Sequence, residues 1–370
     1  MSNKKLNVVL NNYIYKNNRA YAVVGLGGGC VTRDFIIDGN EHFHGNYAFF
    51  NVLADYWKVQ QKYTEMRFAA GRTTSFLSFD AEPSELFNKI TNALEMLLKH
   101  EYEQELFEKA KEKAKNSFSN YYKDSRFRAR YKSFEFLDLN KHFLLSELNK
   151  DIEGIEFADF IKCADKLIVP ANICIYVTGD IREVIKSDYE RLSDVISNRN
   201  HRIQFYNFSY DPYLRNDAHI IELAREDINQ FIAVFDFLNP DCSEFTKSLI
   251  IDIYAEKLKI PELEISVDPC DAGVLYTGKK INSIKNQLTD ISRDEYEKVR
   301  KAVVKKYIMC LQDKPEIFAM EAAQKLLLGI SIQEYISYIE KCPYEKFLKL
   351  CSIADYKISE AQVIFRKEMR

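Results

Sequence analysis

The glycine-rich segment Val23–Phe35, VVGLGGGCVTRDF, has a spacing that could bind phosphate. A dinucleotide-binding turn needs G-x-G-x-x-G between a strand and a helix start, so that backbone amides meet the pyrophosphate. Counted from Gly25, the pattern fails at its last position, which is Cys30, and β-forming residues follow instead of a helix start. No Lys-Ser or Lys-Thr pair follows, which excludes a P-loop. We therefore interpret Gly25–Gly29 as a strand end where glycine lets another backbone approach closely, and we rank nucleotide binding last.

Two histidines that are two residues apart, His42 and His44, offer metal ligands beside Glu41. On a helix, residues i and i+2 point to different sides, so one metal ion could not take both. On a strand they share a face, but other side chains would have to fold round to complete the site. A metal site of this kind stays open as an alternative, with the ligands Asp38, Glu41, His42 and His44. The remaining histidines lack ligand-spaced partners, and we expect surface or structural roles for His100, His142, His201 and His219.

Length and composition limit the classes of function. A chain of 370 residues with 46% hydrophobic residues predicts about two globular domains. The net charge of −3 gives no general preference for nucleic acid or an anionic membrane, so we expect neither as a partner. The eight cysteines form no C-x-x-C pair, and we interpret them as reduced thiols of a cytoplasmic protein. We expect no signal peptide, and no apolar run approaches the roughly 20 residues that span a bilayer.

Hydrophobic periodicity predicts strands and helices in an order that occurs twice. The first half contains a strand at 19–29, a helix at 47–60, a strand within 67–81, helices at 84–98 and 103–122, and a strand at 170–181. The second half contains a strand at 230–238, a helix at 242–258, a strand at 272–278, and mainly helices to about residue 350. This order predicts an α+β fold with two similar domains, 1–190 and 217–370, joined by a linker at 191–216 where periodicity is lost.

Several of these segments, taken together, resemble the insulinase/pitrilysin zinc peptidases, whose inverted motif H-x-x-E-H lies on a helix. DGNEHF at 38–43 is similar to the family phrase D-G-x-A-H-F, in which the histidine is the first metal ligand. Further segments resemble the family in the same order along nearly the whole chain: RFAAGRTTSF, FEKAKEKAKNSFSNYYKDSRFR, PANICIYVTGDI, DINQFIAVFDF and AGVLY. The resemblance implies two related domains, each a mainly antiparallel sheet packed with helices, that form half of a clam-shell.

The residues at the family's catalytic positions differ from those of the active peptidases. With His42 as the first ligand, the catalytic Glu and the second His fall at Gly45 and Asn46. The third ligand, a Glu on the long helix, falls at Ser117, and a supporting Glu falls at Ala110. Hydrolysis needs three protein ligands, an open position for water and a carboxylate base. The resemblance therefore implies no catalytic residue, no metal and no cofactor.

A second register remains open but matches the flanking sequence less well. It interprets Asp38–His42 as D-x-x-E-H, which keeps one Glu and one His. The third ligand would still fall at Ser117.

The family's substrate-binding positions are only partly retained. In the family pattern R-x-x-x-G-x-x-Y, the Arg falls at Pro269 and the Tyr at Tyr276, while an Asn on the substrate-facing strand falls at Met66. Tyr276 and Phe68 remain as candidate substrate-binding residues. An extended peptide could also add to a sheet edge through main-chain hydrogen bonds.

These departures imply a non-catalytic subunit. By the resemblance, it would pair with a zinc-bearing insulinase-like homologue as a heterodimer and complete a peptide-processing chamber. The substrate would be a peptide, for example the precursor of a ribosomally made, modified peptide such as a bacteriocin. Two alternatives stay open: a stand-alone peptide-binding or scaffold homodimer, and a metallopeptidase with an unorthodox metal site at residues 38–44.

Overall fold

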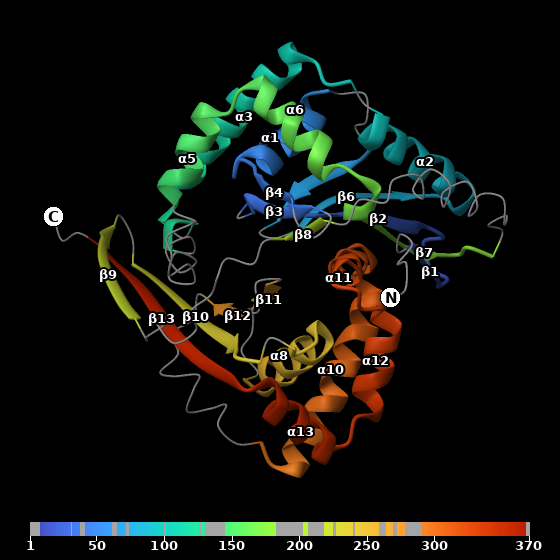
Figure 1. The fold of residues 1–370 in the computed structure, drawn as a ribbon. Coiled ribbons are helices and arrows are strands. Elements are labelled where there is room, and N and C mark those ends of the chain that lie inside the picture. Colours follow the sequence, from blue (N-terminus) through green and yellow to red (C-terminus); the bar gives the residue numbers. More distant parts are fainter. Residues whose placement is uncertain are drawn as a thin grey trace. The chain divides into compact units, whose positions relative to one another are not determined.

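The structure, a computed structural model, forms two compact units, each of which is discontinuous in the sequence (Figure 1). Unit 1 comprises Met1–Asn116, Leu148–Tyr206 and Tyr307–Ile332, and unit 2 comprises Ser117–Glu147, Asn207–Lys306 and Gln333–Arg370. The residues that the structure describes are 8–30, 32–37, 41–60, 65–71, 74–99, 101–125, 127–129, 145–182, 203–205, 218–224, 227–239, 241–258, 264–268, 272–277 and 291–367.

Unit 1 is built on a five-stranded sheet with the strand order β1-β7-β2-β6-β5. These strands are β1 (Val8–Asn12), β2 (Ala20–Gly27), β5 (Arg67–Ala70), β6 (Thr74–Ala81) and β7 (Ile173–Gly179). A second sheet of unit 1 has three strands in the order β4-β3-β8. Strands β3 (Asp34–Ile37) and β4 (Glu41–His44) come before the first helix in the chain, and β8 (Ile203–Phe205) comes much later. The helices described in the first half of the chain include α1 (Phe49–Val59), α2 (Pro83–Lys99), α3 (Gln104–Lys123), α5 (Leu145–Gly154), α6 (Phe157–Leu167) and the short η1 (Pro170–Asn172).

Unit 2 is built on a second five-stranded sheet, with the strand order β11-β12-β10-β13-β9. Its strands are β9 (Ala218–Ala224), β10 (Ile228–Phe237), β11 (Glu264–Asp268), β12 (Ala272–Thr277) and β13 (Tyr356–Lys367). The helices described in the second half of the chain include α8 (Glu244–Leu258), α10 (Arg293–Asp313), α11 (Pro315–Leu327), α12 (Ile332–Lys341) and α13 (Tyr344–Ala354). Among the described residues, no helix is long and apolar enough to cross a membrane.

The two five-stranded sheets have the same topology. In chain order, β1, β2, β5, β6 and β7 occupy the same places in their sheet as β9 to β13 do in theirs. One edge strand of each sheet, β1 or β9, runs parallel to its neighbour, and the other pairings are antiparallel. Helices α1 and α8 both connect the second of these strands to the third. The prediction of an α+β fold with two similar halves is therefore confirmed.

The two halves of the sequence exchange a segment between the units. Residues 307–332, from the second half, belong to unit 1, and residues 117–147, from the first half, belong to unit 2. The contiguous domains predicted at 1–190 and 217–370 do not describe this exchange. Most of the predicted linker, 191–216, lies outside the described residues, so these boundaries stay a prediction.

Helix α11 packs closely on the sheet of unit 1 because β2 has a glycine at the contact. A Cβ atom at Gly25 would lie 2.9 Å from Cys174 Sγ and 3.4 Å from Ala323 Cβ. The Cys174 thiol donates to the carbonyl oxygen of Ala323 at 3.2 Å, and the rings of Tyr176 and Phe318 lie 6.1 Å apart. The space left by Gly25 is thus filled by side-chain atoms of Cys174 and Ala323, and the close approach of another backbone to the glycine run stays a prediction.

Candidate functional site

Strand β4 carries both histidines of the segment in which the sequence suggested a metal site. Glu41, His42 and His44 are exposed, whereas Phe43 is buried. The Phe43 ring packs against Phe35 of β3 at a centroid distance of 6.2 Å. Because side chains alternate along a strand, His42 and His44 share the face opposite Phe43. Asp38, which the metallopeptidase alternative requires, lies outside the described residues.

The charged side chains of β3 and β4 have partners in unit 1. Nδ1 of His44 lies 2.5 Å from Oδ1 of Asp34, directly across the strand pair. Glu41 accepts from Nζ of Lys166 on α6 at 2.8 Å. In the described part of the chain, no three His, Cys, Asp or Glu side chains form a group that could hold a metal ion. That the protein binds no catalytic zinc stays a prediction.

Gly45 and Asn46, the positions of the family's Glu and second His, have structural roles here. The amide of Gly45 donates to the carbonyl oxygen of Arg33 at 2.9 Å, and a Cβ at Gly45 would lie 2.9 Å from that same oxygen. No larger side chain fits without a backbone shift. Oδ1 of Asn46 accepts from the amide of Ala48 at 2.7 Å and so orders the turn into α1.

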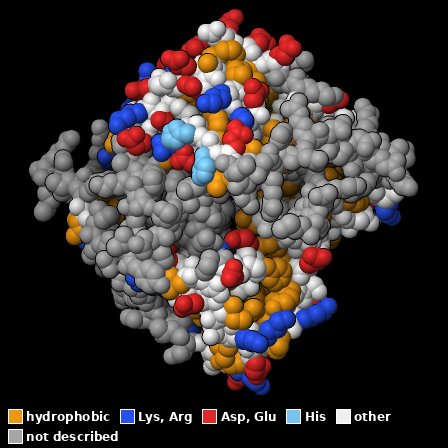
Figure 2. Space-filling view, viewed as in Figure 1, with side chains coloured by type: hydrophobic (Ala, Val, Ile, Leu, Met, Phe, Trp, Pro, Cys, Tyr) orange, Lys and Arg blue, Asp and Glu red, His pale blue; other side chains and the backbone are white. Residues whose placement is uncertain are grey.

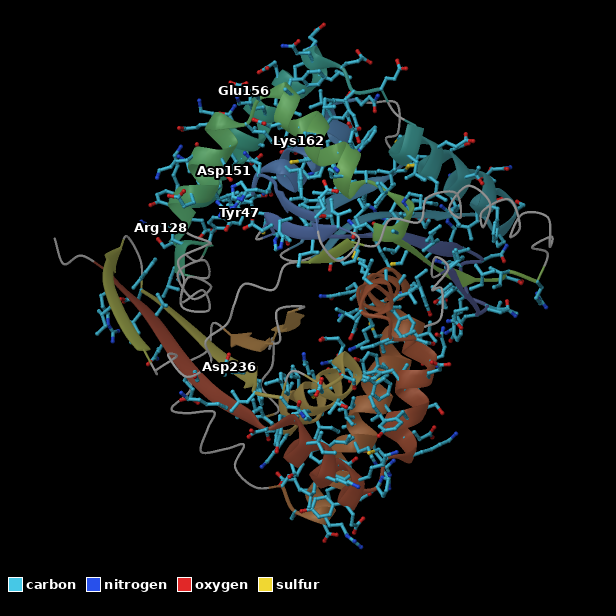
Figure 3. The ribbon with its side chains drawn as sticks, in the orientation of Figure 1. Tyr47, Arg128, Asp151, Glu156, Lys162 and Asp236 are labelled. Atoms are coloured by element: carbon cyan, nitrogen blue, oxygen red, sulfur yellow. The ribbon has the colours of Figure 1, made fainter. Side chains whose placement is uncertain are left out.

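The next residue, Tyr47, connects that turn to helix α5 and to Arg33 (Figure 3). The amide of Tyr47 donates to Oδ2 of Asp151 on α5 at 2.9 Å, and the guanidinium carbon of Arg33 lies 4.7 Å from the Tyr47 ring centroid. His42, Gly45 and Asn46 therefore lie on a strand and a turn. The i, i+3, i+4 spacing brings side chains together only on a helix, so this register does not describe a metal site in the structure.

Helix α1 is the helix that follows, and it offers no such motif in any register. Its sequence, FFNVLADYWKV, contains no His, Cys or Glu. Its one carboxylate, Asp55, is buried and accepts from Nζ of Lys58 at 3.4 Å. Most of its other side chains are buried: Phe49, Phe50, Val52, Leu53, Ala54, Tyr56 and Trp57.

An aromatic cluster fills the space beside α1. Phe160 of α6 is fully buried, and its ring centroid lies 5.4 Å from Phe49 and 5.9 Å from Tyr56. The rings of Tyr102 and Phe107 each lie 5.2 Å from Phe160. Burial raises the pKa of the Tyr102 hydroxyl above its ordinary value. The rings of this cluster supply no imidazole, thiolate or carboxylate, which are the side chains that bind zinc.

Helix α3 carries no carboxylate at the two positions that the resemblance singled out. Ala110 is fully buried and Ser117 is partly exposed. The helix passes from unit 1 into unit 2 between Asn116 and Ser117. A serine hydroxyl does not replace the carboxylate ligand that zinc sites of this class use.

The two candidate substrate-binding residues lie on strands of different units. Phe68 is on β5, an edge strand, but its side chain is only 3% exposed, so a peptide could reach its main chain and not its ring. Tyr276 is on β12, opposite Ile232 of β10 and Glu264 of β11. The side chain of Tyr276 and the whole of Pro269 lie outside the described part.

The glycine run uses its amides within the protein. The amide of Gly29 donates to Oγ1 of Thr32 at 3.2 Å, and the amide of Cys30 donates to the carbonyl oxygen of Gly71 at 2.9 Å. Gly28 has a φ of 105°, which glycine adopts without strain. The element that follows is strand β3 and not a helix. The features of a phosphate-binding turn are therefore missing from this segment.

Comparisons with known proteins place the fold. No family model and no curated protein matches the sequence. A putative M16-like peptidase from Alicyclobacillus acidocaldarius superposes with a TM-score of 0.73 at 11% identity, over 98% of this chain and 97% of that one. A peptidase M16 inactive domain from Pseudomonas fluorescens gives 0.61 at 10% identity, over 98% and 95%. A chain of complex III2 from Candida albicans gives 0.60 at 13% identity, over 96% and 93%. The chain therefore has the fold of the M16-like peptidases, the insulinase/pitrilysin type that its sequence predicts.

Proposed function

We propose that this protein is a non-catalytic peptidase-fold subunit, which pairs with a zinc-bearing homologue to form a peptide-processing chamber. The observation that carries the proposal is helix α1, which has no metal-ligand motif and lies against the aromatic cluster around Phe160. A chain with this fold and without the catalytic groups can contribute shape and binding surface but not hydrolysis.

The edge strand β5 is where a peptide would bind to this subunit. The amide of Gly71 donates to the carbonyl oxygen of Thr74, which fixes a hydrogen-bonded pair at the turn between β5 and β6. The alternation of an antiparallel ladder then directs the main-chain groups of Ala69 toward β6, and those of Phe68 and Ala70 outward. An extended peptide could add to this edge as a further strand.

Two of the similar structures support the proposal by analogy. One is described as an inactive M16 domain, and another is a chain of a multi-protein complex. The substrate that fits an open strand edge is an unstructured peptide, and the precursor of a ribosomally made, modified peptide such as a bacteriocin is one candidate. A fold alone does not fix a substrate, so these points rest on analogy.

Mixing the purified chain with a zinc-bearing M16-like homologue from the same organism tests the proposal. We expect a complex on size exclusion and faster hydrolysis of an unstructured fluorogenic peptide than with the homologue alone. An unchanged rate with no complex would refute the partner role. A complex of the chain only with itself would favour the scaffold homodimer, and hydrolysis by the chain alone would favour the metallopeptidase.

A pair of proline variants tests the β5 edge. Ala70→Pro removes an amide that points outward, so the fold should survive while the stimulation of hydrolysis is lost. Ala69→Pro removes an amide that points toward β6 and should destabilise unit 1. Full stimulation by a folded Ala70→Pro variant would exclude strand addition at this edge.

A further inference from the structure

We propose that His42 and His44 form a surface chelate for one transition-metal ion, on strand β4 and away from the helix that carries the zinc motif in the active peptidases. The inference is independent of the proposed function, because it concerns an exposed sheet face and no catalysis. It differs from the alternative considered from the sequence, which recruits Asp38 and Glu41 as ligands.

The strand geometry brings the two imidazoles to one face. Phe43 and Phe35 are buried on the inner face of the β3–β4 pair, so His42 and His44 lie on the outer face with Asp34 and Ile36. Figure 2 shows two histidine side chains beside each other at the surface. His42 and His44 are the histidines whose side chains the structure describes. Two imidazoles at positions i and i+2 of a strand can converge on one ion.

Asp34 prepares His44 to act as a ligand. Its Oδ1 lies 2.5 Å from Nδ1 of His44, so the ring donates its Nδ1 proton to the carboxylate. When the imidazole is neutral, the lone pair of Nε2 is then left for a metal ion, as in metal sites where a carboxylate orients the ligating histidine. The carboxylate is itself held by Arg33, whose Nε lies 3.5 Å from Oδ2 of Asp34. Asp34 is therefore a positioning residue and not a ligand.

The ligand set selects the class of ion. Imidazole nitrogen suits zinc, copper and nickel, whereas magnesium and calcium prefer oxygen donors. Structural zinc sites use four protein ligands, but no group of three potential ligands is found among the described residues. The ion would therefore be held by two protein ligands and completed by water, which predicts reversible binding at the surface.

Calorimetric titration of the full-length chain with nickel chloride, and separately with zinc chloride, tests the inference. We expect binding of one ion, loss of binding in both His42→Ala and His44→Ala, and about 10- to 100-fold weaker binding in Asp34→Asn. Because both histidines are exposed, the variants should keep the melting temperature of the parent.

Glu41→Gln is the matched control, since Glu41 lies on the same strand but turns to Lys166. It should bind the ion as tightly as the parent. Loss of binding in this variant would assign the ion to the ligand set that includes Asp38 and Glu41, and it would overturn the proposed chelate. No binding to the parent chain, or unchanged binding in a variant that lacks both histidines, would also overturn it.

Discussion

Unit 1 and unit 2 share a sheet topology but differ in the helix that connects the second strand to the third. In unit 1 this helix, α1, has mostly apolar side chains and packs into an aromatic cluster. In unit 2 the corresponding helix, α8, buries Lys247, whose Nζ lies 2.9 Å from Oε1 of Glu244. Neither helix contains a histidine. The topology is common to both units, while the chemistry of the connecting helix is particular to each.

A second difference precedes these helices. Unit 1 inserts strands β3 and β4 between β2 and α1, whereas only residues 238–243 separate β10 from α8 in unit 2. The insertion carries the two histidines and Asp34. The two histidines that we propose as metal ligands thus lie on an added sheet and not in the part that the two units share.

Removing one buried phenylalanine ring from each unit should have the largest effect on the free energy of unfolding. Phe160 of unit 1 and Phe347 of unit 2 are both fully buried, and Phe347 lies 4.8 Å from Tyr296 by ring centroids. Phe160→Ala and Phe347→Ala should each lower the free energy of unfolding by about 3–5 kcal/mol, because a cavity replaces the ring. Tyr121→Ala, at a side chain that is 58% exposed, is the control and should change it little.

Two thiols, the buried Cys163 and the partly exposed Cys351, can report the unfolding of each unit separately. Burial raises the pKa of Cys163 in unit 1 and of Cys351 in unit 2 to about 12, so neither thiolate forms at mildly alkaline pH while its unit is folded. Alkylation along a urea gradient, read by mass spectrometry, should move the Cys163 midpoint most in Phe160→Ala and the Cys351 midpoint most in Phe347→Ala. Equal shifts at both cysteines would mean that the units unfold together.

Filling the space under α11 should have the next largest effect, and only in unit 1. Gly25→Val places atoms where Cys174 Sγ and Ala323 now lie, so we expect a loss of about 1–3 kcal/mol from overpacking. The same alkylation experiment should show this loss of stability as a lower urea midpoint at Cys163. Cys174→Ala should restore part of the lost stability. Gly154→Ala is the control, because nothing lies within 4 Å of a Cβ there. An equal loss in both glycine variants would contradict the close approach.

The sequence predicted the repeated fold because hydrophobic periodicity is a local property. It could not predict the exchanged segments: the apolar face of α11 shows that the helix is buried but not which sheet it covers. The segment Glu41–His44 is too short for periodicity to separate a strand from a helix start. Asp38-Gly39, which follows the apolar residues Phe35–Ile37, is a hairpin signal that could have placed these residues on strands. Asp34 was missed as a partner of His44 because only the hairpin register brings the two together.

The smallest expected effects concern how each connecting helix begins. In unit 2, Oγ of Ser243 accepts from the amide of Thr246 at 3.2 Å, whereas in unit 1 Asn46 accepts from Ala48, which precedes α1. Ser243→Ala should cost about 1 kcal/mol, and Asn46→Ala about 0.5 kcal/mol, because the asparagine orders the turn and not the first helical turn. Urea midpoints at Cys351 and Cys163 measure the two losses.

Asn46→Asp keeps the acceptor oxygen and should restore the midpoint; if it does not, the hydrogen bond is not what makes the residue stabilising. A loss at Asn46 as large as that at Ser243 would show that both units begin their connecting helix with the same strength, and the contrast between them would then rest on side-chain packing alone.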